Sequence, residues 1–123
     1  MEQLKSLNDQ IGGSHYKNLV QQPIEFITKA SLSFIQGNIV KYITRYKHKN
    51  GKQDVEKIIH YANLAIDLKD EGPNAKMLNL AYSYCKANEL SSYQTNIIIA
   101  CVQDDYYGVL RYCKQLLKSE YPD

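Results

Sequence analysis

The sequence of 123 residues contains no tryptophan and only two phenylalanines, although it has eleven tyrosines. Its three cysteines are an odd number without C-x-x-C spacing, so the sequence favours neither a disulfide framework nor a zinc ribbon. No apolar run approaches the roughly 18 residues of a membrane-spanning helix, and the first residues lack the apolar core of a signal peptide. We therefore expect a cytoplasmic protein that has no membrane partner.

The chain also has little net charge, because 15 Lys and Arg oppose 13 Asp and Glu. A balance of +2 does not by itself indicate a polyanionic partner. Residues 41–52, however, contain no acidic side chain. Their five cationic residues are Lys41, Arg45, Lys47, Lys49 and Lys52. Such a patch suits a phosphate group, because Arg forms fork-shaped hydrogen bonds and Lys supplies a point charge. The alternative is a solvated helix end whose lysines complement the helix dipole.

Hydrophobic spacing predicts an all-α fold, a compact bundle of about six helices with an N-terminal arm over residues 1–20. The expected helices cover residues 23–30, 34–46, 53–70, 75–87, the segment after Ser91, and 105–118. Capping-box patterns at Ser33–Gln36 and Ser91–Gln94 begin two of them. The sequence shows no internal repeat. Gly72-Pro73 predicts a boundary between a domain of residues 1–72 and a C-terminal helical extension of residues 73–123 packed on it.

Two predictions concern packing. Helices 34–46 and 53–70 should pack together and bury Ile39, Ile43, Ile58, Ile59 and Ala62. Three short helices cannot bury all the apolar side chains of residues 74–123 by themselves. We therefore expect them to pack on the first half and to contribute to a homo-oligomer interface. The tyrosines expected at its rim are Tyr106, Tyr107 and Tyr112. The alternative is an independent bundle behind the Gly72-Pro73 break.

A polar face on the helix 34–46 is the main candidate site. Asn38, Lys41 and Arg45 lie one and two helical turns apart, so they share a face. An amide there can hydrogen-bond a base or a sugar while the cations hold phosphate. Gly37 costs helix stability, which indicates close approach of a ligand or of another part of the chain.

A second candidate site follows Gly12-Gly13. Consecutive glycines let backbone N–H groups turn toward an anion, and His15 can donate to phosphate or move a proton near neutral pH. No G-x-x-x-x-G-K-[ST] segment is present, so P-loop chemistry is excluded.

Four short motifs occur in a fixed order in the first half of the sequence. They are G-G-x-H-Y-K at 12–17, Q-P-I-E-F-I at 22–27, G-N-x-x-K-Y-x-x-R at 37–45 and K-N-G-x-x-D at 49–54. As a set, over about residues 10–68, they closely resemble a small tailed-phage domain family of unknown function that is often described as a phage nucleotide kinase.

The resemblance implies a phage origin, an infected or lysogenic bacterial host, and phosphoryl transfer to (deoxy)nucleoside monophosphates without a P-loop. ATP and Mg²⁺ would then be the cofactors. The positions that would bind nucleotide or phosphate are His15, Tyr16, Lys17, Asn38, Lys41, Arg45 and Lys47. Asp54 would place the Mg²⁺ ion. The resemblance does not identify a catalytic residue.

Two other functions remain open from the sequence. The first is a non-enzymatic phage effector without a cofactor, which sequesters a nucleotide signal or inhibits a host defence complex such as a CRISPR effector. The second is a nucleic-acid binder that uses residues 41–52 as a phosphate clamp and nearby tyrosines as a stacking platform. These functions differ in what they bind. A kinase binds two nucleotides and converts them, whereas an effector that sequesters a nucleotide binds one and leaves it unchanged. The affinity of a nucleic-acid binder falls steeply as the salt concentration rises.

Overall fold

The computed structural model describes residues 19–72 and 77–122 of the chain. His15, Tyr16 and Lys17 of the predicted site lie outside the described residues. The described part is all-α, as predicted, with six α-helices and no strand. The helices are α2 (Pro23–Lys29), α3 (Phe34–Arg45), α4 (Lys52–Leu68), α5 (Leu78–Ala87), α6 (Ser92–Val102) and α7 (Tyr106–Glu120). A one-turn 3₁₀ helix, η1 (Tyr46–His48), follows α3. None of these helices is long and apolar enough to cross a bilayer.

Local sequence signals account for the helix boundaries. Ser33 and Ser91 each accept the backbone N–H of the glutamine three residues later, and that glutamine accepts the serine N–H, so both predicted capping boxes form. Gly51 has a φ of 53°. Its N–H donates to the carbonyl of Tyr46 at 2.8 Å, and the same glycine is the N-cap of α4. The glycine therefore ends one helical segment and begins the next.

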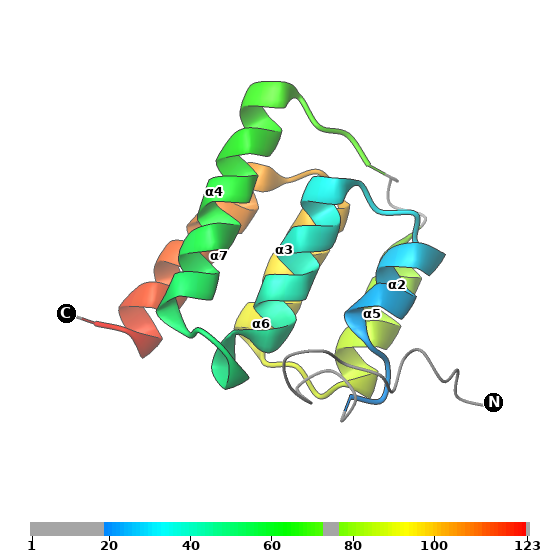
Figure 1. Cartoon of the computed structure of the whole chain (residues 1–123), viewed down its shortest axis with the longest axis horizontal. Coiled ribbons are helices and arrows are strands. Elements are labelled where there is room, and N and C mark those ends of the chain that lie inside the picture. The colour runs from blue at the N-terminus through cyan, green and yellow to red at the C-terminus, as the bar shows by residue number, and fades with distance from the viewer. Residues whose placement is uncertain (1–18, 73–76, 123) are drawn as a thin grey trace.

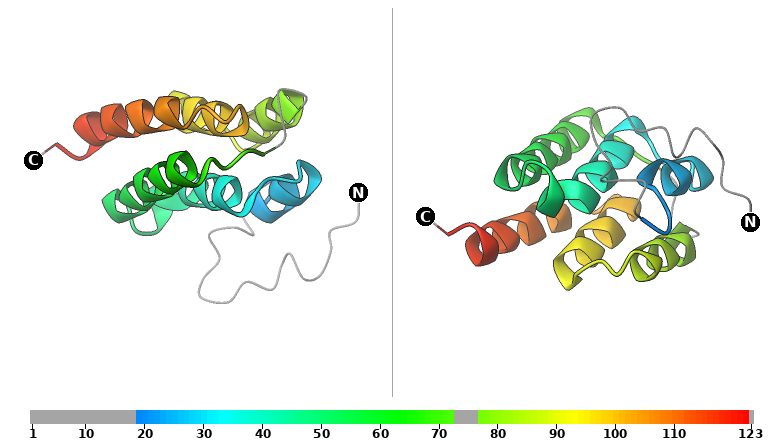
Figure 2. Two further views of the ribbon diagram at one scale, coloured as in Figure 1. Left: turned by 90° about the horizontal axis from the view of Figure 1, so that it is seen from above. Right: turned by 60° about the horizontal axis from the view of Figure 1, so that its bottom comes forward.

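The six helices form two layers of three (Figure 1). One layer contains α2, α3 and α4, and the other contains α5, α6 and α7, as the view from above shows (Figure 2). Across the layers α3 contacts α6, α4 contacts α7 and α2 contacts α5. The second half of the chain therefore covers the inner face of the first half.

A hydrophobic core lies between the layers. Of the five residues predicted to be buried in α3 and α4, Ile39, Ile43, Ile58 and Ala62 are completely buried and Ile59 is partly buried. The second layer adds fully buried side chains from α6 and α7, among them Ile97, Ile98 and Leu116. Both layers therefore depend on each other for their burial of apolar surface.

The structure corrects one residue's predicted place and decides between the two alternatives at another. Tyr106 is only 4% exposed and its hydroxyl donates to Asp70, so its predicted place at an oligomer rim was wrong. Gly37 is buried against α2, where an added Cβ would lie 3.2 Å from Cγ2 of Ile27. The glycine thus allows α2 and α3 to pack closely, and the neighbouring helix, not a ligand, explains it.

Candidate functional site

Three cationic groups surround one aromatic ring on the outer face of the first layer. The ring belongs to Tyr42 of α3. Its centroid lies 4.7 Å from Cζ of Arg45, 5.1 Å from Nζ of Lys57 and 5.6 Å from Nζ of Lys41. Cations are attracted to the negative face of an aromatic ring. Positive charge from both α3 and α4 is therefore concentrated at one point.

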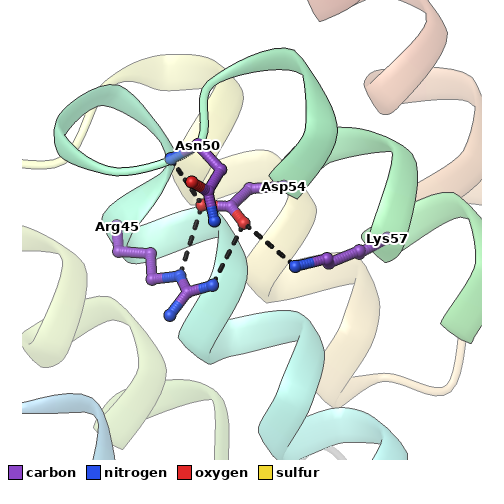
Figure 3. Close-up of polar contacts among 4 residues, drawn as sticks. All are labelled: Arg45, Asn50, Asp54 and Lys57. Carbon is purple, nitrogen blue, oxygen red and sulfur yellow. Dashed lines mark hydrogen bonds and ion pairs between the residues drawn. The ribbon is translucent and has the colours of Figure 1, made fainter. Parts of the chain in front are cut away.

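Asp54, at the start of α4, holds the arginine of this cluster (Figure 3). Nε and Nη2 of Arg45 donate to the two carboxylate oxygens of Asp54, each at 3.2 Å. The backbone N–H of Asn50 donates to the same carboxylate at 3.3 Å, and Nζ of Lys57 lies 3.9 Å from it. The Asp54 side chain is 0% exposed and that of Arg45 12% exposed. A carboxylate buried this completely needs such partners, so the pair fixes the position of the guanidinium.

These contacts do not fit the predicted role of Asp54 as a Mg²⁺ ligand. Both carboxylate oxygens already accept hydrogen bonds, and a metal ion would have to displace the Arg45 guanidinium. Elsewhere in the described residues, no group of three or more His, Cys, Asp or Glu side chains is arranged to hold a metal ion.

Two further aromatic rings extend the site. Tyr61 of α4 stacks on Tyr42, with ring centroids 6.0 Å apart and planes inclined by 22°. Phe34 of α3 meets Tyr61 edge to face, with centroids 6.3 Å apart and an angle of 70°. Phe34 is 77% exposed, an unusual position for so large an apolar side chain. The three aromatic side chains therefore form a row that ends at Phe34, and the Phe34 ring is open to stacking by a ligand.

Helical spacing places the polar residues of α3 along the same face. Asn38 is four residues after Phe34 and three before Lys41, and its Nδ2 donates to the carbonyl of Phe34 at 2.9 Å. Phe34 and Lys41 are separated by seven residues, so they lie about 10 Å apart along the helix axis. We call the set of Phe34, Asn38, Lys41, Tyr42, Arg45, Lys57 and Tyr61 the α3–α4 site.

The structure brings only part of the predicted site together. Asn38, Lys41 and Arg45 share the α3–α4 site, whereas Lys47 lies on η1 and is exposed beside the ring of Tyr46, 6.0 Å from its centroid. Sequence reasoning missed Phe34, Tyr42, Lys57 and Tyr61 as site residues. The four-residue spacing of Lys57 and Tyr61 places them on one face of α4, and this spacing was visible in the sequence. Only the pairing of α3 with α4 shows that these residues meet.

A second polar cluster lies at the opposite end of α4, beside a cleft of about 360 Å³ that includes Tyr106 in its lining. Asp70 accepts the hydroxyl protons of Ser33 and Tyr106. Asp104 accepts Nε2–H of Gln36 and the backbone N–H of Gly72. Both carboxylates thus join the ends of helices from the two layers.

The three cysteines supply no reactive thiol. All three are buried and none forms a disulfide. Burial raises the pKa of the Cys85 thiol to about 11 and that of Cys113 to about 12. Because the thiolate is the nucleophilic form, these groups are inert near neutral pH.

Comparison with known families gives one match. A family described as a protein of unknown function, DUF3310, matches residues 11–63, which is less than half of the chain. That stretch contains α2, α3 and most of α4, and it includes every residue of the α3–α4 site. No curated protein and no solved structure matches the chain.

Proposed function

We propose that this protein binds a nucleotide at the α3–α4 site. The proposal depends on one observation, the exposed Phe34 ring on the same helical face as a cluster of three cations. A base stacked on an aromatic side chain contributes about 1–3 kcal/mol. The separation of about 10 Å along α3 is the reach from the base of a nucleotide to its phosphate groups.

Each residue of the site has a role in this arrangement. The base stacks on Phe34, and Asn38 lies beside the sugar between the ring and the cations. Lys41 and Lys57 hold the phosphate, while Arg45, fixed by Asp54, orients it. Three cations against the one carboxylate of Asp54 leave the site with an excess of positive charge.

The activity that we propose for the bound nucleotide is phosphoryl transfer from ATP to a (deoxy)nucleoside monophosphate. Its transition state needs positioning and charge neutralisation more than covalent chemistry, and clustered cations supply both. The motifs at residues 12–54, which resemble the phage family, support this activity together with a phage origin in a bacterial cytoplasm.

Sequestration of a nucleotide without turnover is the second candidate. One observation favours it, because Asp54, the carboxylate that holds Arg45 of the α3–α4 site, is completely buried. A carboxylate in that position is not open to accept a proton from a substrate phosphate.

Isothermal titration of the full chain with each deoxynucleoside monophosphate tests the binding proposal. Lys41→Ala and Phe34→Ala should each weaken affinity by about 1–3 kcal/mol, roughly 5- to 150-fold. Lys114→Ala, which removes an exposed lysine from α7, is the matched control and should leave affinity unchanged. If the parent protein binds no nucleotide at millimolar concentration, the proposal is wrong.

Turnover separates the two candidates. The protein is incubated with ATP, Mg²⁺ and the monophosphate that it binds, and the nucleotides are resolved by chromatography. Formation of diphosphate, lost in Lys41→Ala, supports phosphoryl transfer. Binding without diphosphate supports sequestration.

A further inference from the structure

The two layers of the fold share a pattern of helix ends at a fixed distance along the chain. α3 begins at the N-cap Ser33, and α6 begins at the N-cap Ser91, 58 residues later. The C-caps of the preceding helices, α2 and α5, are Ala30 and Asn88, again 58 residues apart. The residue after each of these C-caps has a positive φ, 52° at Ser31 and 53° at Glu89.

The hydrogen bonds of these turns repeat as well. Leu32 N–H donates to the carbonyl of Ile27 at 3.1 Å, and Leu90 N–H donates to that of Cys85 at 3.0 Å. The same turn also ends α4 and α6, where Lys69 and Asp104 have a positive φ and the next N–H donates to the carbonyls of Ala65 and Ala100. The turn is therefore a common helix C-cap, and it is the spacing of 58 residues that relates the two layers.

Contacts between the layers are reciprocal. Nε2 of Gln36 donates to the carbonyl of Cys101 at 3.1 Å, and Nε2 of Gln94 donates to that of Ile43 at 2.9 Å. Each residue of the second bond lies 58 positions from its equivalent in the first, so a two-fold rotation exchanges the two bonds.

An aromatic pair marks the axis of this rotation. Phe26 and Tyr84, which are also 58 residues apart, stack on each other with centroids 4.8 Å apart. A residue that packs against its own equivalent must lie on or close to the two-fold axis.

The last helices of the two layers, α4 and α7, also correspond to each other. Their spacing is smaller because the connection from α6 to α7 is shorter than that from α3 to α4. The N-caps of α4 and α7 are Gly51 and Asp105, which are 54 residues apart. Counted from these caps, Val55 corresponds to Val109 and Ala62 to Leu116, and all four side chains are completely buried. At these positions the two three-helix units bury equivalent side chains toward the same core.

We propose that the chain is an internal pseudo-dimer, in which α5–α7 occupies the place that a second copy of α2–α4 would take. The inner face of the first layer then fits a partner of its own kind. The sequence showed no repeat because few equivalent positions keep the same residue. The retained identities include Ser33 and Ser91, Gln36 and Gln94, Asn38 and Asn96, and Ile39 and Ile97.

Only the first layer of the pseudo-dimer has the binding face. On the outer face of α6 and α7, Ser92 stands where Phe34 stands in the first layer, Ile99 replaces Lys41, and Gln115 replaces Tyr61. Ala100 and Gln103 hold the positions of Tyr42 and Arg45, and only the position of Lys57 keeps a cation, Arg111. The second face thus lacks the equivalents of the three aromatic rings and of two of the three cations. This consequence rests on the proposed nucleotide binding, and it predicts one bound nucleotide per chain.

The number of nucleotides bound by the full chain tests this consequence. Equilibrium dialysis of the parent should give one bound nucleotide per chain, and Lys41→Ala should weaken that binding. Arg111→Ala, which removes an exposed cation at the position equivalent to Lys57, is the matched control and should change neither the affinity nor the number bound. Two nucleotides per chain, or binding that Arg111→Ala weakens, would overturn the assignment of the binding face to the first layer.

A second experiment needs no ligand, so it separates this proposal from the proposed function. Residues 78–121 are replaced by a second copy of residues 20–68 behind the natural linker. We expect a cooperative thermal transition by circular dichroism and a monomer by light scattering, because the inner face fits its own copy. A chain without a cooperative transition contradicts the pseudo-dimer. If the parent binds no nucleotide, the proposed function fails while this result still decides the architecture.

Discussion

At the scale of single residues, Asp54 determines the geometry of the α3–α4 site. Its fully buried carboxylate is paired with Arg45 and accepts a backbone N–H at the start of α4. The pair links the end of α3 to the beginning of α4 across the turn that η1 forms. Asp54 thereby keeps Arg45 beside the ring of Tyr42. The helical conformation of α3 would not by itself hold the arginine side chain in this position.

We predict that Asp54→Asn lowers the free energy of unfolding by about 3 kcal/mol, because removal of one partner leaves the other charge poorly paired in a mostly buried position. Urea denaturation followed by circular dichroism measures the change. Glu56→Gln, which removes an exposed carboxylate two residues away on the same helix, should change stability by less than about 0.5 kcal/mol. Equal midpoints for the two variants would show that the pair is not a structural link.

The sequence identified the polar half of the site but not its aromatic half. Asn38, Lys41 and Arg45 follow from helical spacing within one segment, and the structure places all three on one face. Tyr42 and Tyr61 lie on different helices, so their stacking depends on how α3 and α4 pack. The exposure of Phe34 depends on packing in the same way, since apolar residues are normally assigned to the core.

At the scale of helices, the two capping-box glutamines act beyond their own helices. Gln94 is 4% exposed, accepts the N–H of Ser91 and donates to the carbonyl of Ile43 in the other layer. The first contact was predictable from the Ser91–Gln94 pattern. The second was not, because its acceptor lies 51 residues away in sequence. One side chain therefore both begins a helix and joins the layers.

We predict that Gln94→Ala costs about 2–3 kcal/mol of stability, since it removes part of a cap and leaves a buried carbonyl without its partner. Ser91→Ala removes only the cap and should cost about 1 kcal/mol. Chemical denaturation of both variants gives the comparison, with Gln103→Ala at an exposed position as control. The interlayer bond contributes nothing measurable if the Gln94 and Ser91 variants unfold at the same urea concentration.

At the scale of the whole molecule, buried cysteine thiols and tyrosine hydroxyls make the free energy of unfolding depend on pH in the alkaline range. Burial raises the pKa values of Cys85 and Cys113 to about 11 and about 12 from an ordinary value of 9.0. Tyr46 and Tyr106 are shifted upward too, by burial and by hydrogen bonds to Glu120 and Asp70. The folded protein therefore keeps protons that the unfolded chain releases.

This contribution is fully present below pH 9 and is lost as the pH rises toward 11. Each buried thiol should lower the free energy of unfolding by about 1.4 kcal/mol per pH unit over that range. Urea midpoints measured at pH 8, 9 and 10.5 test the trend, and Cys113→Ala should reduce the slope. A midpoint that does not change up to pH 10.5 would contradict the burial of these groups.

The helical class and the helix boundaries were within reach of the sequence, because caps and apolar spacing are local signals. The arrangement in two layers was not, since it depends on contacts such as α3 with α6 and α4 with α7. The homo-oligomer stays a prediction, as does the domain boundary after residue 72. The burial of Tyr106 shows why composition alone misleads here, because a tyrosine can be buried when its hydroxyl finds a carboxylate.

The central claim is that a nucleotide binds on the outer face of α3 and α4, and amide chemical-shift mapping of the full chain tests it most directly. During titration with the deoxynucleoside monophosphates and ATP, we expect the largest shifts at Phe34, Asn38, Lys41, Tyr42 and Tyr61. The equivalent positions on the other layer, Ser92, Asn96 and Ile99, should not shift. Saturating shifts confined to the α3–α4 site would support the account. Shifts elsewhere, or none at millimolar nucleotide, would contradict it.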